Sequence, residues 1–168
     1  MGAGILPVAM CKGVLYLLLG QEQNNNLWSD FGGSSHTNEK PFKTAIREGT
    51  EELNGFLGSE EELDDEVESN KILSINYEQY TTYIFRIDYN EYLPKYFNNN
   101  NKFIEKHAKS IINNKHNGLY EKKNIKWFKL NTFNNVENLS LLRHHYKEHI
   151  KCILENKELI ISTIKKLE

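Results

Sequence analysis

Three glutamates, Glu48, Glu51 and Glu52, stand close together in a segment that the sequence predicts to be a helix. Pro41 suits the first turn of that helix, where a missing N–H costs nothing, and no proline follows before Leu53. With an advance of about 100° per residue, the three carboxylates fall on one helical face. Like charges three or four residues apart destabilise a helix by about 0.2–0.5 kcal/mol per pair, so the cluster is unfavourable unless a cation lies among the carboxylates. Hard oxygen ligands of this kind suit Mg²⁺ or Mn²⁺, and the pattern predicts a divalent metal site.

Other residues around the cluster also keep fixed spacings. Gly33 is followed six residues later by Glu39, and Arg47 directly precedes the first glutamate of the cluster, where it can pair with Glu39. The segment from Gly33 to Gly55 resembles the Nudix box, the pattern G-x5-E-x7-R-E-U-x-E-E-x-G-U, in which U is a bulky aliphatic residue. Every charged position of the pattern is filled at the right spacing. The alternative interpretation, a solvated acidic helix face, explains the three glutamates but not the residues that precede them.

Two residues depart from the pattern. Gly49 stands where the first U is expected, and it weakens the helix by up to about 1 kcal/mol without a gain that the sequence reveals. Asn54 stands where the last glycine is expected. If this position ends the helix in the left-handed backbone region, Asn is the usual second choice after Gly. Asn54→Gly is then expected to be neutral or mildly stabilising.

The resemblance implies both a fold and a chemistry. Nudix hydrolases have an α/β (α+β) fold, a mixed β-sheet sandwiched between helices, and they split a diphosphate bond in a nucleoside diphosphate linked to another moiety. Water attacks one phosphorus, Mg²⁺ ions neutralise the developing charge, and a glutamate takes the proton. By this resemblance, Glu48, Glu51 and Glu52 are the expected metal ligands and catalytic carboxylates. Arg47 is expected to support them, and the carbonyl of Gly32 is a further candidate ligand.

Glu121 is a candidate from outside the box. It lies six residues before Trp127. In several Nudix enzymes a glutamate at a similar distance before such a tryptophan reaches the metal centre from an opposite loop. Glu121 is therefore a candidate further ligand or general base, with Glu105 in reserve, and the alternative is an exposed acid flanked by lysines.

The rest of the chain divides into segments typical of strands and helices, and we expect a single Nudix hydrolase domain over residues 1–168. Apolar or alternating runs predict strands, at 5–10, 14–19, 71–77, 81–89 and 125–130. Pro7 favours an edge strand or a bulge for the first of them. The acidic stretch 59–68 is interpreted as a solvated loop or short helix. Apolar residues at helical spacing predict a helical insertion after Pro94 and a long C-terminal helix over 138–167 that packs on the sheet.

The insertion is rich in lysine, although the whole chain has a net charge of −2. Between Lys95 and Lys129, nine lysines face two acidic residues, an excess of seven positive charges. Lys102, Lys106 and Lys109 are expected along one helix face. This charge suits an RNA or polyphosphate partner. A solvated surface explains it equally well, because few aromatic residues are interleaved for base stacking, and the asparagine run 98–101 is interpreted as compositional bias.

The sequence leaves the substrate open. Nudix enzymes for dinucleoside polyphosphates often carry a tyrosine, and those for ADP-ribose a proline, at set distances beyond the box, but about 16 residues after Gly55 stand Lys71 and Ile72, which match neither. Capped RNA in an mRNA decapping-like reaction, a dinucleoside polyphosphate, a diphosphoinositol polyphosphate and a housekeeping nucleotide all stay open. The alternative from another class is a catalytically silent Nudix-like module that binds nucleotides or RNA. The intact carboxylate set argues against that alternative.

Composition excludes several classes of protein. No apolar run approaches the roughly 18 residues of a membrane span, and nothing resembles a cleavable signal peptide. Cys11 and Cys152 are too few for a disulfide framework and are expected to be reduced, so we expect a cytoplasmic protein. His144 and His145 have no other ligand at metal spacing and are expected at the surface.

Overall fold

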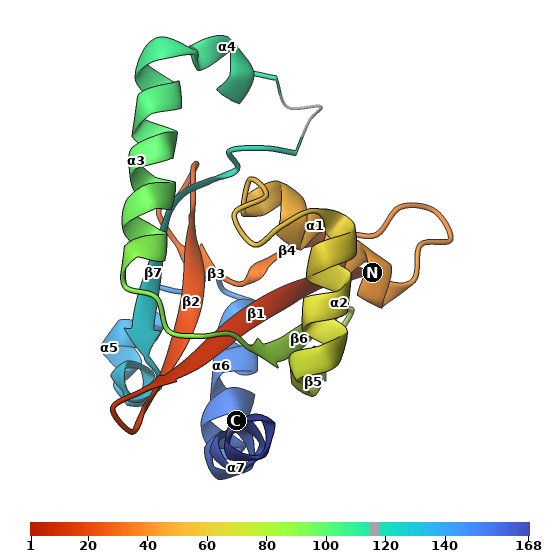
Figure 1. Ribbon diagram of the computed structural model, residues 1–168, viewed down its shortest axis with the longest axis vertical. Helices are drawn as coiled ribbons and strands as arrows, with labels where there is room; N and C mark the ends of the chain where they lie inside the picture. The colour runs from red at the N-terminus through yellow and green to blue at the C-terminus, as the bar shows by residue number, and fades with distance from the viewer. Residues whose placement is uncertain (115–117) are drawn as a thin grey trace.

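The computed structural model describes residues 1–114 and 118–168. A mixed sheet runs through the centre of this part of the chain, with helices on both faces (Figure 1). Its strands are β1 (Gly2–Cys11), β2 (Val14–Glu22), β3 (Trp28–Ser29), β4 (Phe31–Ser34), β5 (Lys71–Tyr77), β6 (Tyr80–Arg86) and β7 (Lys122–Lys129). Their order is β3-β2-β1-β6-β5, with β4 pairing with β1 and β7 pairing with β2. Only β1 and β6 are parallel among these described pairs, and the predicted mixed sheet between helices is confirmed.

Alternating side chains explain why helices cover both faces of the sheet. Leu17 and Leu19 of β2 pack into one core with the last helices of the chain, whereas Leu18 packs into a second core with helices of the Nudix-like segment and the insertion. The helices are α1 (Pro41–Glu52), α2 (Glu60–Asn70), α3 (Tyr92–His107), α4 (Lys109–Ile112), α5 (Val136–Leu139), α6 (Tyr146–Glu155) and α7 (Lys157–Leu167), and a 3-10 turn, η1 (Leu130–Asn134), precedes α5. Within the described ranges, no helix has both the length and the apolar character that crossing a membrane requires.

Pro7 lies in a central strand, so the expectation of an edge strand or a bulge is wrong. β1 pairs with β6 along Gly2 to Val8, and on its other side it changes partner from β4, at Ile5, to β2, at Val8. The N–H of Gly2 and the carbonyl of Val8 form hydrogen bonds on the β6 side. By alternation, the nitrogen of Pro7 faces the gap between the two partners on the other side, where the missing N–H removes no ladder hydrogen bond.

The single long C-terminal helix predicted over 138–167 is wrong, because α5, α6 and α7 take its place. Between α5 and α6 the chain runs beside β3, where Trp28 donates to the carbonyl of Leu141 and accepts from the N–H of Arg143. Asn156 separates α6 from α7, and its side-chain amide donates at 2.8 Å to a carbonyl in the last turn of α6. The predicted packing on the sheet is confirmed, because α6 and α7 both contribute to its core.

The acidic stretch 59–68 lies in α2. Ser59 accepts a hydrogen bond from the N–H of Glu62, whose side chain bonds back to the N–H of Ser59, so the helix begins with a capping box. Leu63 and Val67 are buried in the core that α1 shares. The stretch is therefore a helix with one apolar edge and a solvated acidic surface.

The asparagine run has a structural role that compositional reasoning missed. Helix α3 lies along β7 (Figure 1), whose strand partner is β2. Asn98 accepts from the N–H of Ile125 at 2.8 Å and donates to the carbonyl of the same residue at 3.2 Å, as a neighbouring strand would. Asn101, one turn later, donates to the carbonyl of Lys122 at 2.7 Å. The two amides therefore bind backbone groups that the edge of a sheet otherwise leaves open.

Gly49 allows α1 to pack close to β1. A Cβ atom at this position would lie 2.5 Å from Cδ1 and 2.7 Å from Cγ1 of Ile5, closer than atoms approach in a packed interior. The glycine therefore lowers helix propensity but permits close contact between the helix and the sheet.

Gly49→Ala is expected to destabilise the protein by about 1–3 kcal/mol, although alanine is the better helix former, because the added methyl group overpacks the contact with Ile5. Chemical denaturation measures the free energy of unfolding. In an Ile5→Ala background the methyl group has room, and the same change is expected to be neutral or stabilising. A Gly49→Ala change that leaves stability unaltered in both backgrounds would contradict the role of this contact.

Candidate active site

Arg47 connects the loop after β4 to helix α1. Its Nε and Nη2 donate to the two carboxylate oxygens of Glu39 at 3.0 Å each, and Nη2 also donates to the carbonyl of Ser34 at 3.1 Å. Its Nη1 donates to Glu48 at 2.8 Å and to Glu51 at 3.4 Å. Hydrogen bonds from Arg47 lower the pKa of Glu39 to about 2, and the bond to Glu39 is the main cause that raises the pKa of Arg47. The predicted pairing of Arg47 with Glu39 is confirmed, and the same guanidinium offsets repulsion between two glutamates of the box.

Glu48 and Glu51 lie against glycine backbone. A Cβ at Gly33 would lie 2.5 Å from Oε2 of Glu48, and a Cβ at Gly118 would collide with the carboxylate of Glu51. The glycines thus let β4 and the loop before β7 approach the two carboxylates. Burial raises the pKa of Glu51, the neighbouring guanidinium lowers it, and the charges of Glu48 and Glu121 raise it further. The loop before β7 therefore faces α1, and the role of Glu121 as ligand or base stays a prediction.

The reserve candidate has a different environment. Glu105 is exposed on α3, the helix that lies along β7. The charge of Glu121, in contrast, is one of the main causes that raise the pKa of Glu51. Between the two acids considered from sequence, the structure places Glu121 near the box.

Glu52 is only 3% exposed, and both of its carboxylate oxygens face groups of the protein. Oε2 accepts the N–H of Gly32 at 2.8 Å, and Oε1 lies 3.4 Å from Nζ of Lys122. The ammonium of Lys122 also binds the carboxylate of Glu22 and, at 3.0 Å, Oγ of Ser29. Burial raises the pKa of Glu52 to about 8, against the opposing charge of Lys122. Lys122 was included among the lysines of a basic surface, and this is wrong, because its side chain is completely buried.

The expected metal site is only partly matched by these contacts. Among the described residues, no group of three or more His, Cys, Asp or Glu side chains is placed to hold an ion. The predicted ligands instead contact cations of the chain, with Arg47 at Glu48 and Glu51, and Lys122 at Glu52. The oxygens of Glu48 and Glu51 are hard donors of the type that Mg²⁺ and Mn²⁺ prefer, and they fit such an ion. Glu52 fits it poorly, because both of its oxygens have partners within the protein.

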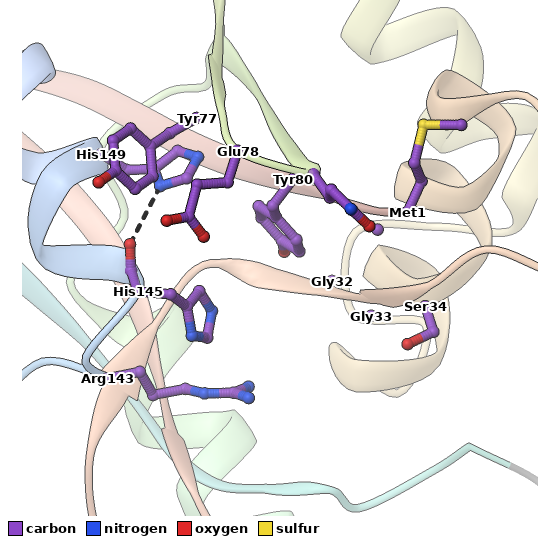
Figure 2. Close-up of a pocket in the computed structure, with 12 residues that line it drawn as sticks. Met1, Gly32, Gly33, Ser34, Tyr77, Glu78, Tyr80, Arg143, His145 and His149 are labelled. Carbon is purple, nitrogen blue, oxygen red and sulfur yellow. Dashed lines mark hydrogen bonds between the residues drawn. The ribbon is translucent and has the colours of Figure 1, made fainter.

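A cavity of about 360 Å³ opens beside Gly32 and Gly33 (Figure 2). Side chains from β5, β6 and the turn between them line it together with side chains from α6 and the preceding segment. Its ring-bearing and charged lining residues are Tyr77, Glu78, Tyr80, Arg143, His145 and His149. The carboxylate of Glu48 lies against Gly33, one of the residues that line the cavity.

Aromatic and imidazole rings form one wall of this cavity. The ring of Tyr80 lies 5.8 Å from that of His145 and 5.5 Å from that of His149, and its hydroxyl donates to Asp30 at 3.0 Å. Burial lowers the pKa of His145, and the charge of Arg143 lowers it further, so this ring is neutral near pH 7. Nε2 of the buried His149 has no hydrogen-bond partner in the described part of the chain. His145 is half-buried in this wall, and the sequence alone did not single out the other residues of the wall.

Comparisons with solved structures identify the class of fold. A scan against family models finds no match, and no curated protein matches the chain. The Nudix hydrolase RenU from M. smegmatis superposes with a TM-score of 0.51 at 14% identity, over 94% of this chain and 85% of that one. A second similar structure is a bifunctional NMN adenylyltransferase/ADP ribose pyrophosphatase from Francisella tularensis, solved with AMP and a Mn ion. It superposes with a TM-score of 0.53 at 15% identity, over 92% of this chain and 41% of that one. A C. elegans Ap4A hydrolase gives 0.48 at 16% identity, over 92% of this chain and 97% of that one.

The described chain therefore has the architecture of a mixed sheet between helices with an acidic helix beside a cavity. More particularly, it has the fold of the Nudix hydrolases. The fold that the box from Gly33 to Gly55 implied is confirmed.

Asn54 connects three segments of this site. Its φ is 51°, so the prediction of a left-handed residue after α1 is confirmed. Its Nδ2 donates to Oδ1 of Asn101 in α3 at 3.1 Å, and its Oδ1 accepts the N–H of Tyr120 at 2.8 Å. Glycine makes neither bond, so these contacts favour Asn over Gly at this position, against the equivalence expected from the sequence. Since Tyr120 precedes Glu121, Asn54 also holds the loop that carries this candidate ligand.

Asn54→Gly is expected to lower the free energy of unfolding by about 1–3 kcal/mol, because the N–H of Tyr120 loses its acceptor. Asn54→Asp keeps that acceptor and is the matched control, with a smaller loss. Asn54→Val places a β-branched side chain at positive φ and should be the least stable of the three. Chemical denaturation measures the order, and a glycine variant as stable as wild type would contradict the linking role.

Proposed function

We propose that residues 1–168 form one Nudix hydrolase domain, a Mg²⁺- or Mn²⁺-dependent pyrophosphohydrolase that cleaves a diphosphate bond in a nucleoside diphosphate linked to another moiety. The observation that carries the proposal is the position of Glu48. Its carboxylate is held by Arg47, which in turn is held by both oxygens of Glu39, and it lies against Gly33 at the border of the cavity. A fixed carboxylate beside a cavity is the arrangement that this chemistry needs.

The residues of the site have different roles in the proposed reaction. Glu48 and Glu51, with Glu121 and the carbonyl of Gly32 as further candidates, would hold the divalent cation, which supplies charge neutralisation at the phosphate when bound. Arg47 keeps the first two carboxylates in place through its hydrogen bonds. A glutamate of this cluster takes the proton from the attacking water.

The lining of the cavity favours a nucleotide over an inositol pyrophosphate. The rings of Tyr77, Tyr80 and His145 offer flat apolar surfaces that suit a nucleobase. Arg143 lines the same cavity and suits a phosphate group. An inositol pyrophosphate has no aromatic ring to stack and carries many charges, and it would need a larger set of cations than this wall provides. The ADP ribose pyrophosphatase among the similar folds is a further reason to test nucleoside diphosphate derivatives first.

A turnover screen tests the proposal. The purified chain with Mg²⁺ or Mn²⁺ is offered ADP-ribose, dinucleoside polyphosphates, capped RNA and inositol pyrophosphates, and products are identified by chromatography. We expect metal-dependent cleavage of a nucleotide substrate, and Glu51→Gln should lower kcat by about 10²–10⁴-fold. Glu61→Gln, an exposed glutamate of α2, is the matched control and should leave kcat unchanged. Tight nucleotide binding without turnover of any substrate would instead identify a catalytically silent binding module.

Capped RNA is a finer proposal that rests on the surface of the insertion. Lys102 and Lys106 are exposed on α3, and Lys109 is exposed at the start of α4. The expected single helix face is wrong for Lys109, because the backbone leaves the helical region at Ala108, with φ −141° and ψ 45°. Phe103 is 61% exposed on the same helix, so an aromatic ring is interleaved with the lysines after all. Exposed cations beside an exposed ring suit a single-stranded RNA backbone.

Changing Lys102, Lys106 and Lys109 together to Gln is expected to weaken binding of capped RNA and to flatten the dependence of log Kd on log salt by about 2, since each single-strand contact contributes about 0.7. Hydrolysis of a free dinucleotide should barely change. Lys165→Gln with Lys166→Gln, on α7, is the control pair. An unchanged salt slope would show that these lysines are solvated surface residues that do not bind RNA. A loss of dinucleotide hydrolysis as large as the loss of RNA binding would place them in the phosphate pocket.

A further inference from the structure

Lys122 is a completely buried lysine whose ammonium has a full set of partners. An ammonium carries three N–H donors and no acceptor. The three oxygens that face it are those of Glu22, of Ser29 at 3.0 Å and of Glu52 at 3.4 Å. A buried charge is stable only when it is paired in this way.

The surrounding chain is shaped to hold this side chain in place. Glu22 at the end of β2 pairs with Lys122 at the start of β7, at an irregularity in the register. Gly20 makes room for the lysine stem, because a Cβ there would lie 2.9 Å from both Cγ and Cδ of Lys122. The carbonyl of Lys122 accepts from Asn101 of α3 at 2.7 Å. Two strands and the insertion helix therefore position one ammonium group.

The ammonium stands where a metal ion would need to bind Glu52. One oxygen of this carboxylate accepts the N–H of Gly32, and the other faces Lys122. A divalent ion on the second oxygen would lie beside a buried positive charge, where the low dielectric leaves the repulsion largely unscreened. It would also have to displace an ion pair that is buried on both sides.

We propose that Lys122 is a resident cation of the active site, which takes the place of a metal ion at Glu52 and confines divalent metal to Glu48 and Glu51. This inference rests on the proposed function, because it states which glutamates of that same site bind divalent metal. Lys122 acts as a positioning residue, since it holds Glu52, and Glu52 in turn holds the backbone of Gly32 beside the cavity.

Removal of the ammonium should create a metal site. In Lys122→Met an apolar side chain of similar length removes the ammonium that Glu22 and Glu52 share, so Glu52 loses its cation and Glu22 keeps only Arg143, which donates to it at 3.1 Å. Two carboxylates with the hydroxyl of Ser29 are hard oxygen donors that suit Mn²⁺. The double variant Lys122→Met with Glu22→Gln removes one of the two charges and should lose the new site again.

Mn²⁺ binding tests the inference without any measurement of turnover. Free Mn²⁺ in titrations of the full chain is counted by electron paramagnetic resonance. Lys122→Met is expected to bind about one more Mn²⁺ than wild type. Lys123 is the neighbouring lysine, and its ammonium contacts Asn26. Lys123→Met is therefore the matched control and should bind as many Mn²⁺ ions as wild type.

Diffraction from wild-type crystals soaked in Mn²⁺ gives a second measurement that does not depend on folding of a variant. The anomalous signal should lie at Glu48 and Glu51, with Lys122 still on Glu52. Mn²⁺ bound by Glu52 with Lys122 displaced, or equal Mn²⁺ counts in wild type and Lys122→Met, would overturn the inference even if turnover is found. Absence of turnover with the expected Mn²⁺ positions would overturn the proposed function and leave the inference standing.

Discussion

The buried carboxylate of Glu52 is the interaction on which the site depends. It accepts a backbone N–H from β4 and faces an ammonium from β7, so one side chain of α1 connects two strands that are not neighbours in the sheet. A buried charge without partners is strongly destabilising, so α1, β4 and β7 must be in place together. Glu48 and Glu51 lie on the same helix, within one turn of Glu52. Their position beside the cavity follows from the anchoring of Glu52.

Close approach of backbone to side chain is the second constraint, and it explains the glycines of the site. Gly33 and Gly118 allow β4 and the loop before β7 to approach the carboxylates of Glu48 and Glu51. Gly49 allows the helix to pack closely on Ile5 of the sheet. A side chain at Gly33 or Gly118 would displace these carboxylates, and one at Gly49 would push the helix away from the sheet. The glycine in the middle of α1 is thus required by packing and not by backbone conformation.

The sequence predicted the parts of the site that depend on local spacing. The helix of the box and the pairing of Arg47 with Glu39 follow from patterns within a few residues, and the mixed sheet is what the resemblance to the Nudix box implied. Lys122 and the cavity wall did not follow, because they depend on which strands become neighbours. Glu22 and Lys122 stand 100 residues apart, and only the pairing of β2 with β7 makes them partners. The asparagine run was misread for the same reason, since its role is defined by the strand that it covers.

The predicted repulsion among the three glutamates is resolved by cations of the chain. Arg47 lies between Glu48 and Glu51, and Lys122 pairs with Glu52, so the fold needs no metal ion to hold the acidic cluster together. The two cations differ in what they leave accessible. Arg47 is bound on its other side by Glu39, and its contact with Glu51 is long, at 3.4 Å, so this carboxylate can turn toward an arriving ion while the loop stays in place. Lys122 is completely buried and also binds Glu22 and Ser29, so its ammonium is held beside Glu52. The same sequence pattern thus contains Glu51, whose contact with its cation is long, and Glu52, whose carboxylate is buried among partners of the fold.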